Sequence, residues 1–121
     1  AEFRQVYDIV KEAHDRAIAA VRTGVSGREI DGIARRHIEE QGYGPQFSHG
    51  TGHGVGLDVH EDPRLSPLSD QVLAADMVVT VEPGIYLPGR WGVRIEDMVL
   101  VGEDGCEVLT RMPKELKNID L

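Results

Sequence analysis

The sequence has 121 residues, of which 40% are hydrophobic and 28% are charged, and its formal net charge is −8 at pH 7. This composition is typical of one globular domain and is too apolar for a disordered chain. Only 13 residues are Lys or Arg and no basic run occurs, so we expect no binding to nucleic acid and none to a membrane. No apolar run is long enough to cross a bilayer, and Cys106 has no cysteine partner within the chain. A lone cysteine is compatible with a reducing compartment, and we expect a cytoplasmic location.

Two amphipathic helices are predicted in the first third of the chain. Apolar residues recur at helical spacing from about residue 3 to residue 22. Gly24 is placed to end this helix, because glycine adopts positive φ without strain. Ser26 and Glu29 match a capping box that begins a second helix, which runs to about residue 41. The predicted buried faces consist of Val6, Val10, Ala13, Ala17 and Ala20 in the first helix and Ile30, Ile33, Ala34, His37 and Ile38 in the second, with His14 off the first face.

Strands and turns are predicted after Gly44-Pro45. The run MVVTVE, residues 77–82, has the β-branched apolar pattern of a buried strand, and residues 93–101, VRIEDMVLV, predict one long strand. Residues 103–105 predict a hairpin turn that leads into a returning strand, CEVLT. Two helices followed by mostly antiparallel strands indicate the α+β class.

Three of the five histidines lie in one stretch, HGTGHGVGLDVHE, residues 49–61. Its four glycines disfavour a helix, since each costs about 1 kcal/mol there relative to alanine. In an extended chain, even spacing places side chains on one face, so we expect His49 and His53 to point together, and Asp58 and His60 likewise. Glycine between them permits close approach of backbone or substrate. This pattern indicates a metal-binding or acid–base role.

Two carboxylates on the predicted strands could complete such a site. Glu82 ends the first strand, and Glu96 shares a face of the second with Arg94. Charged groups on a well-buried strand require a compensating charge. One imidazole and two carboxylates suit Mn²⁺, Co²⁺ or Zn²⁺.

Each residue taken singly also has a structural interpretation. Glu82 could be no more than a strand-end residue, and Arg94 and Glu96 could form a surface pair. His14 and His37 lack a neighbouring cluster of polar groups, and we interpret them as structural or solvated.

Four segments together resemble the proline-specific pita-bread metallopeptidases, which are the Xaa-Pro dipeptidases (prolidases) and Xaa-Pro aminopeptidases. The segments are HGTGHGVGLDVHEDPRLS, VEPGIY, GVRIEDMVLV and DGCEVLTRMPKEL. The resemblance implies a curved, mostly antiparallel sheet with two helices. It also implies two divalent metal ions held by two aspartates, one histidine and two glutamates, with Mn²⁺ favoured and Co²⁺ or Zn²⁺ as alternatives. The implied reaction is hydrolysis of peptides that carry proline at the second position.

The resemblance also assigns roles to individual residues. His53, Glu82 and Glu96 resemble the metal ligands, with Glu96 bridging both ions and Glu82 also available as a general base. His60 resembles the catalytic histidine that contacts the substrate and stabilises developing negative charge. The resemblance also places His49 at the substrate pocket and Arg94 beside the bridging carboxylate. Apart from the resemblance, we expect Tyr86 to line the site and to contact the substrate with them.

The two aspartate ligands of the family precede the first helix of this sequence. We therefore expect residues 1–121 to be the C-terminal portion of a catalytic domain, without the upstream half and the N-terminal domain. Such a portion is expected to be inactive alone and to form a homo-oligomer through its uncovered face. Two other functions stay open: a non-catalytic module of this fold that binds peptides or proteins, and an aminopeptidase acting on N-terminal methionine.

Overall fold

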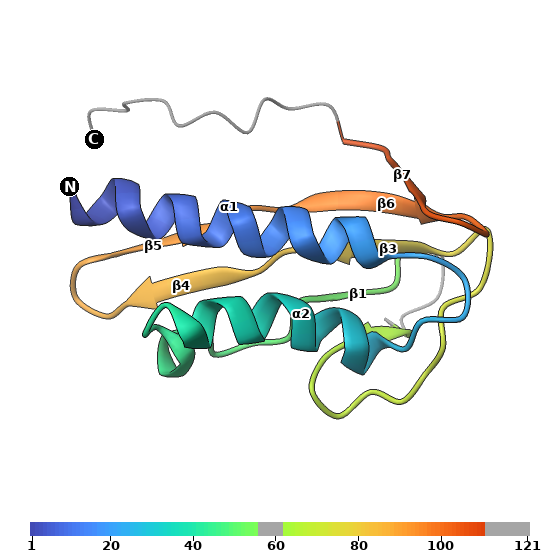
Figure 1. Ribbon diagram of the computed structural model, residues 1–121, viewed down its shortest axis with the longest axis horizontal. Helices are drawn as coiled ribbons and strands as arrows, with labels where there is room; N and C mark the ends of the chain where they lie inside the picture. The colour runs from blue at the N-terminus through green and yellow to red at the C-terminus, as the bar shows by residue number, and fades with distance from the viewer. Residues whose placement is uncertain (56–61, 111–121) are drawn as a thin grey trace.

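A computed structural model of the protein describes residues 1–55 and 62–110. Two helices, α1 (Glu2–Ala20) and α2 (Gly27–Glu40), pack against each other and lie on one side of a set of antiparallel strands (Figure 1). A short 3₁₀ helix, η1 (Gly44–Gln46), follows α2. The strands are β1 (Gly52–His53), β2 (Arg64–Leu65), β3 (Val78–Val81), β4 (Gly84–Leu87), β5 (Trp91–Arg94), β6 (Asp97–Val101) and β7 (Cys106–Val108). The predicted α+β class is confirmed. Neither described helix has the length and apolar character of a membrane span.

The helix boundaries follow the capping signals in the sequence. The first helix ends at Ala20, slightly before the predicted position, and Gly24 beyond it has a φ of +93°. Ser26 caps α2, because its hydroxyl accepts a hydrogen bond from the Glu29 backbone N–H at 3.1 Å. Gly42 follows α2 with a φ of +91°. The predicted apolar faces are buried in both helices, except that Ala20 and Ile33 are only partly buried.

The expected position of His14, off the buried face of α1, is wrong. Its side chain is 3% exposed, and its Nε2 lies 2.8 Å from Oδ2 of Asp97 in β6. Thr110 donates a hydrogen bond to the other oxygen of this carboxylate. The buried pair joins α1 to β6, where it compensates a charge that would otherwise be costly to bury. His37 is also buried, and this burial lowers its pKa, so its structural interpretation fits the fold.

The region from β3 to β6 is one long antiparallel hairpin. Strand β3 pairs with β6 up to Val81 and Asp97, and β4 pairs with β5 from Gly84 and Arg94 onward, in the same register. Between the two ladders stands Pro83, which has no N–H to donate. The single long strand predicted here is therefore found as two strands, β5 and β6. The hairpin predicted after β6 is confirmed, since β7 returns along β6.

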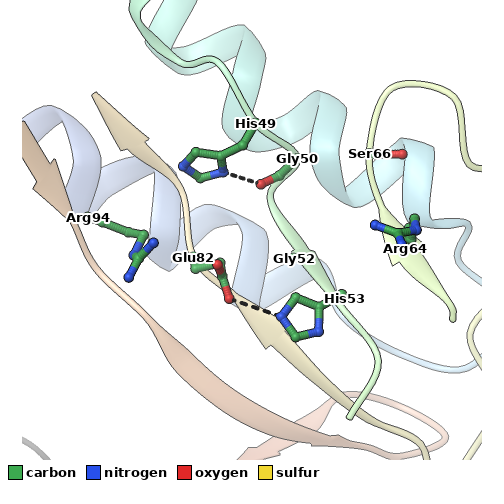
Figure 2. A pocket seen from close by; sticks show the side chains of 8 residues that line it. All are labelled: His49, Gly50, Gly52, His53, Arg64, Ser66, Glu82 and Arg94. Carbon is green, nitrogen blue, oxygen red and sulfur yellow. Dashed lines mark hydrogen bonds and ion pairs between the residues drawn. The ribbon is translucent and has the colours of Figure 1, made fainter. Parts of the chain in front are cut away.

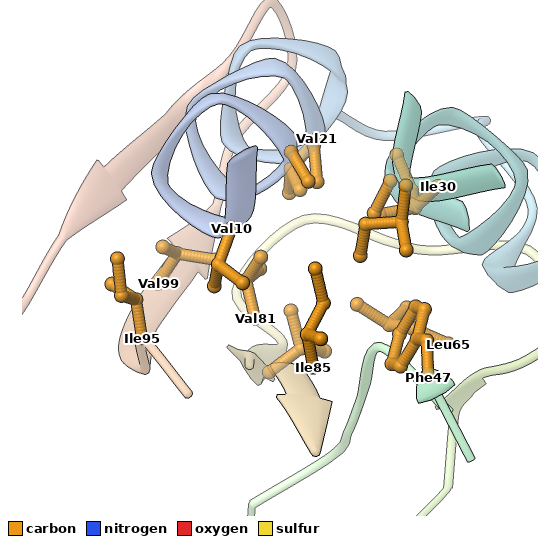
Figure 3. Close-up of a cluster of buried hydrophobic side chains, with 14 of the residues drawn as sticks. Val10, Val21, Ile30, Phe47, Leu65, Val81, Ile85, Ile95 and Val99 are labelled. Carbon is orange, nitrogen blue, oxygen red and sulfur yellow. The ribbon is translucent and has the colours of Figure 1, made fainter. Parts of the chain in front are cut away.

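The hydrophobic core lies between the helices and the strands (Figure 3). Side chains from both helices and from β2 to β6 meet there, and burial of such apolar surface is the main driving force for folding. The core includes Val10, Val21, Ile30, Phe47, Leu65, Val81, Ile85, Ile95 and Val99. Strand β1 lies along the outer edge of β3, where Gly54 pairs with Val79 and the Val55 N–H donates to the Val78 carbonyl at 2.8 Å. This contact places the histidine segment beside the end of β3.

Candidate functional site

A cavity of about 380 Å³ opens where β1, β2 and the end of β3 meet (Figure 2). It is lined by His49, Gly50, Gly52, His53, Arg64, Ser66, Glu82 and Arg94. Four of these residues, His49, His53, Glu82 and Arg94, are among the site residues predicted from the sequence. The fold therefore brings together groups that come from three separate segments of the chain.

Close backbone approach explains the glycines of the histidine segment. A Cβ atom at Gly52 would overlap the carbonyl oxygen of Thr80, and one at Gly54 would overlap the carbonyl oxygen of Asp62. Between these glycines, the His53 N–H donates to the Thr80 hydroxyl at 3.0 Å. Residues 52–54 of this segment are extended, as the sequence predicted, and they are held between β3 and the chain that leads into β2.

His53 presents one ring nitrogen to Glu82. Its Nδ1 lies 2.9 Å from the Gly54 carbonyl, which can only accept, so Nδ1 donates to it, and in the neutral ring Nε2 then holds the lone pair. This Nε2 faces Oε2 of Glu82 at 3.6 Å (Figure 2). The distance is long for a direct hydrogen bond. A histidine fixed by a carbonyl at one nitrogen, with the other turned to a carboxylate, is the usual arrangement of a metal ligand.

Glu96 stands opposite Glu82 in the hairpin. The register that pairs Val81 with Asp97 and Gly84 with Arg94 places the two glutamates at facing positions, where Cβ atoms lie about 4.5–5.5 Å apart. Like charges at such positions repel each other unless a cation lies between them. The pair therefore fits a divalent metal ion.

Glu96 itself is not among the residues that line the cavity. The side chains of Arg94 and Glu96 are 51% and 45% exposed, with 4.0 Å between Arg94 Nη2 and Glu96 Oε1. As the sequence predicted, Arg94 and Glu96 share one face of this segment, and Val93, Ile95 and Asp97 lie on the other, buried face. The face with the two charged residues is exposed, so the segment is buried on one side only. Among residues 1–55 and 62–110, no three His, Cys, Asp or Glu side chains converge as a ready metal site.

His49 is held on the other side of the cavity. Its Nδ1 donates to the Gly50 carbonyl at 2.6 Å, and the Tyr86 hydroxyl donates to its Nε2 at 2.7 Å. A Cβ atom at Gly84 would lie 2.7 Å from that hydroxyl, so glycine leaves room for it. Tyr86 was expected to line the site. It is not among the lining residues, but its hydroxyl contacts His49, which is.

Two lining residues were missed by the sequence analysis. Arg64 lies opposite His53 in the β1–β2 pair, and Ser66 follows it. The signal that could have found them is their place in the segment PRLS, directly after the histidine stretch. With Arg94, Arg64 brings a second guanidinium to the cavity of a chain whose net charge is −8. Guanidinium groups suit a carboxylate or another anion. The predicted catalytic residue His60 lies outside the described residues.

Comparison with known proteins extends these observations. The model of metallopeptidase family M24 matches residues 1–103. The Xaa-Pro dipeptidase of Pyrococcus furiosus is 51% identical over 113 residues, which are 93% of this chain and 32% of that protein. A solved Xaa-Pro dipeptidase from Bacillus anthracis superposes with a TM-score of 0.92 at 51% identity, over 95% of this chain and 32% of that one. The X-Pro aminopeptidase of Thermotoga maritima MSB8 gives a TM-score of 0.90 at 48% identity, over 94% of this chain and 32% of that one.

The chain thus spans about a third of the length of the relatives it matches. The resemblance noted in the sequence is confirmed, and so is the predicted pita-bread architecture, which these solved structures share. The family match covers both helices and the strands up to β6. This chain belongs to metallopeptidase family M24.

Proposed function

We propose that the full-length protein containing this chain hydrolyses the bond before proline in peptides that carry proline at the second position. The likeness to Xaa-Pro dipeptidases supports this substrate class. The observation that carries the proposal is that Nε2 of His53 faces Glu82 while Nδ1 is held by a backbone carbonyl. Glu96 at the facing register position adds the second carboxylate.

In this proposal His53, Glu82 and Glu96 hold divalent metal ions, with Mn²⁺ favoured and Co²⁺ or Zn²⁺ as alternatives. When bound, two such ions lower the pKa of water and polarise the scissile carbonyl. Glu82 takes the proton of the attacking water as a general base. His60 donates a hydrogen bond to the oxygen on which negative charge develops.

The substrate is positioned by the other polar groups of the cavity. His49, held by Tyr86, lies on one side, and Arg94 lies on another. The amide bond before proline has no N–H, so an enzyme must recognise the ring and the groups around it. Arg64 and Arg94 would attract the substrate carboxylate.

Two kinds of Xaa-Pro peptidase remain as candidates. The dipeptidase requires a free carboxylate directly after proline, whereas the aminopeptidase accepts longer peptides. Solved relatives of both kinds match at similar identity, 51% for the Xaa-Pro dipeptidase of Bacillus anthracis and 48% for the X-Pro aminopeptidase of Thermotoga maritima, so substrate length decides between the two candidates. The full-length protein, stripped with a chelator and reloaded with Mn²⁺, should be assayed on Ala-Pro, Ala-Pro-Ala and Met-Ala. Turnover of Met-Ala alone would indicate a methionine aminopeptidase, and no turnover of any peptide would favour a binding module.

His60→Ala in the full-length protein should lower kcat by roughly 100-fold, the usual scale for one donor to an oxyanion. The metal content should stay near that of the unchanged protein, because His60 acts on the substrate and is no ligand. Metal analysis beside steady-state kinetics checks both parts. Loss of metal in step with activity would show that His60 is a ligand and that the roles of His60 and His53 are exchanged.

The 121-residue chain alone should not hydrolyse Xaa-Pro peptides. We propose that it is the C-terminal portion of the catalytic domain and that two aspartate ligands come from the preceding portion. Those aspartates would supply two of the negative charges that hold the cations, so the ligands that remain should bind cations weakly. An assay of the isolated chain on Ala-Pro with excess Mn²⁺ tests this expectation. Cleavage that depends on Mn²⁺ would contradict it.

A further inference from the structure

Helix α2 carries an ion pair between Asp31 and Arg35, and Asp31 lies among the buried residues of that helix. The carboxylate of Asp31 is 1% exposed and accepts two hydrogen bonds from Arg35, one from Nε at 2.9 Å and one from Nη2 at 3.1 Å. Burial of a charge is costly even when it is paired, so a buried pair needs further contacts to be favourable. The further hydrogen bonds of this pair join it to residues 47–51, the segment beside the cavity.

Arg35 holds the segment that carries His49. Its Nη1 donates to the Phe47 carbonyl at 2.9 Å, and its Nη2 donates to the His49 carbonyl at 2.8 Å. The guanidinium carbon also lies 4.1 Å from the centre of the Phe47 ring. The planar fork of one arginine thus fixes two carbonyls and one ring at once, which the single ammonium of lysine cannot do.

Asp31 connects the same pair to Glu82. Its Oδ1 accepts hydrogen bonds from the Thr51 backbone N–H at 3.1 Å and from the Thr51 hydroxyl at 2.9 Å. The carbonyl of the fully buried Thr51 in turn accepts from the Glu82 N–H at 2.6 Å. A continuous set of hydrogen bonds therefore runs from α2 to the backbone of this proposed ligand.

We infer that Asp31 and Arg35 are positioning residues for the reaction of this site. The pair fixes the backbone at His49 through Arg35 and at Glu82 through Thr51, so it sets the spacing between the two sides of the cavity. The inference rests on the proposed function. A displacement of about 1 Å in a reacting group can cost 100-fold in rate, even when the change is remote from the chemistry.

The test is Arg35→Lys in the full-length protein. Lysine keeps the charge beside Asp31 but releases the carbonyls, and kcat should fall by about 10- to 100-fold per folded molecule. The visible absorption of the Co²⁺-loaded protein should also change, because Asp31 loses the two-pronged contact with Arg35 and so holds Thr51, and through it the Glu82 backbone, less firmly. The matched control is Arg16→Lys, since Arg16 forms the same i,i+4 pair with Glu12 on the exposed side of α1. This control should leave kcat and the spectrum unaltered.

A second pair of variants, at Thr51, tests the inference even if Arg35→Lys fails to fold. Thr51→Val removes the hydroxyl that bonds to Asp31 with little change of shape, and Thr51→Ser restores it. We expect Thr51→Val to lower kcat and alter the Co²⁺ spectrum, and Thr51→Ser to recover most of both. A merely structural role would lower the yield of folded protein or its thermal midpoint without changing kcat or the spectrum.

The outcomes separate the inference from the proposed function. If the unchanged protein takes up Co²⁺ and cleaves Xaa-Pro peptides, while Arg35→Lys and Thr51→Val keep its kcat and spectrum, the inference alone is overturned. The inference is also overturned if Arg16→Lys changes kcat and the Co²⁺ spectrum as much as Arg35→Lys does. If the unchanged protein neither binds Co²⁺ nor cleaves these peptides, the proposed function fails, and the inference that rests on it is overturned too.

Discussion

Glu96→Gln in the full-length protein should abolish most of its peptidase activity, lowering kcat by roughly 100-fold or more. Removal of a group that merely orients a metal ligand costs about 10- to 100-fold, so loss of a proposed ligand should cost at least the upper value. The amide is uncharged and has one acceptor oxygen in place of two, so it would hold cations less well. The position of Glu96 opposite Glu82 in the hairpin makes it the second carboxylate of the proposed site.

The stability of the metal-free protein should not fall when Glu96→Gln lowers the activity. In metal-free protein, Glu96→Gln removes the repulsion between two facing carboxylates, so the free energy of unfolding should stay level or rise. Kinetics and chemical denaturation of the same preparation check both results. Glu107→Gln, an exposed glutamate of β7, is the control and should change neither quantity. Near-normal turnover by Glu96→Gln would overturn the metal assignment.

Gly52→Ala should destabilise the fold by about 3 kcal/mol or more, the upper range for overpacking at a closely packed position. A Cβ atom there would overlap the Thr80 carbonyl oxygen and approach the Thr80 hydroxyl to 3.1 Å. Both atoms are held by the β3–β6 ladder, so relief requires β1 to move away from β3. That movement would also break the hydrogen bond from the His53 N–H to Thr80.

Denaturant unfolding of Gly52→Ala and of a matched glycine variant measures this effect. Gly105 lies in the β6–β7 hairpin, and a Cβ atom there would meet nothing within 4 Å. Gly105→Ala should therefore stay within about 0.5 kcal/mol of the unchanged protein. Equal stability of the two variants would show that β1 does not lie against β3 as described.

Local patterns in the sequence predicted much of this architecture. Residues such as Val6 and Val10 lie one helical turn apart, and that spacing depends only on the helix itself. The glycines around His53 excluded a helix for the same local reason. The break between β5 and β6 was missed because its cause is on the partner strand, where Pro83 cannot donate to the ladder.

The buried polar pairs could not be predicted, because their burial depends on distant segments. Asp31 and Arg35 lie four residues apart on a helix, a spacing that equally describes an exposed ion pair. Only the packing of residues 47–51 against α2 makes the pair internal. His14 likewise has no local signal, since its partner, Asp97, belongs to the far end of the chain.

The common register of the hairpin has a consequence for the order in which the site assembles. Glu82 and Glu96 are brought face to face by closing a single hairpin, whose contacts are local. His53 arrives only when β1 docks on the edge of β3, a contact between segments further apart in the chain. Loop-closure entropy grows with that separation. We therefore expect Glu82 and Glu96 to come together first during folding, and His53 to join them when β1 packs against β3.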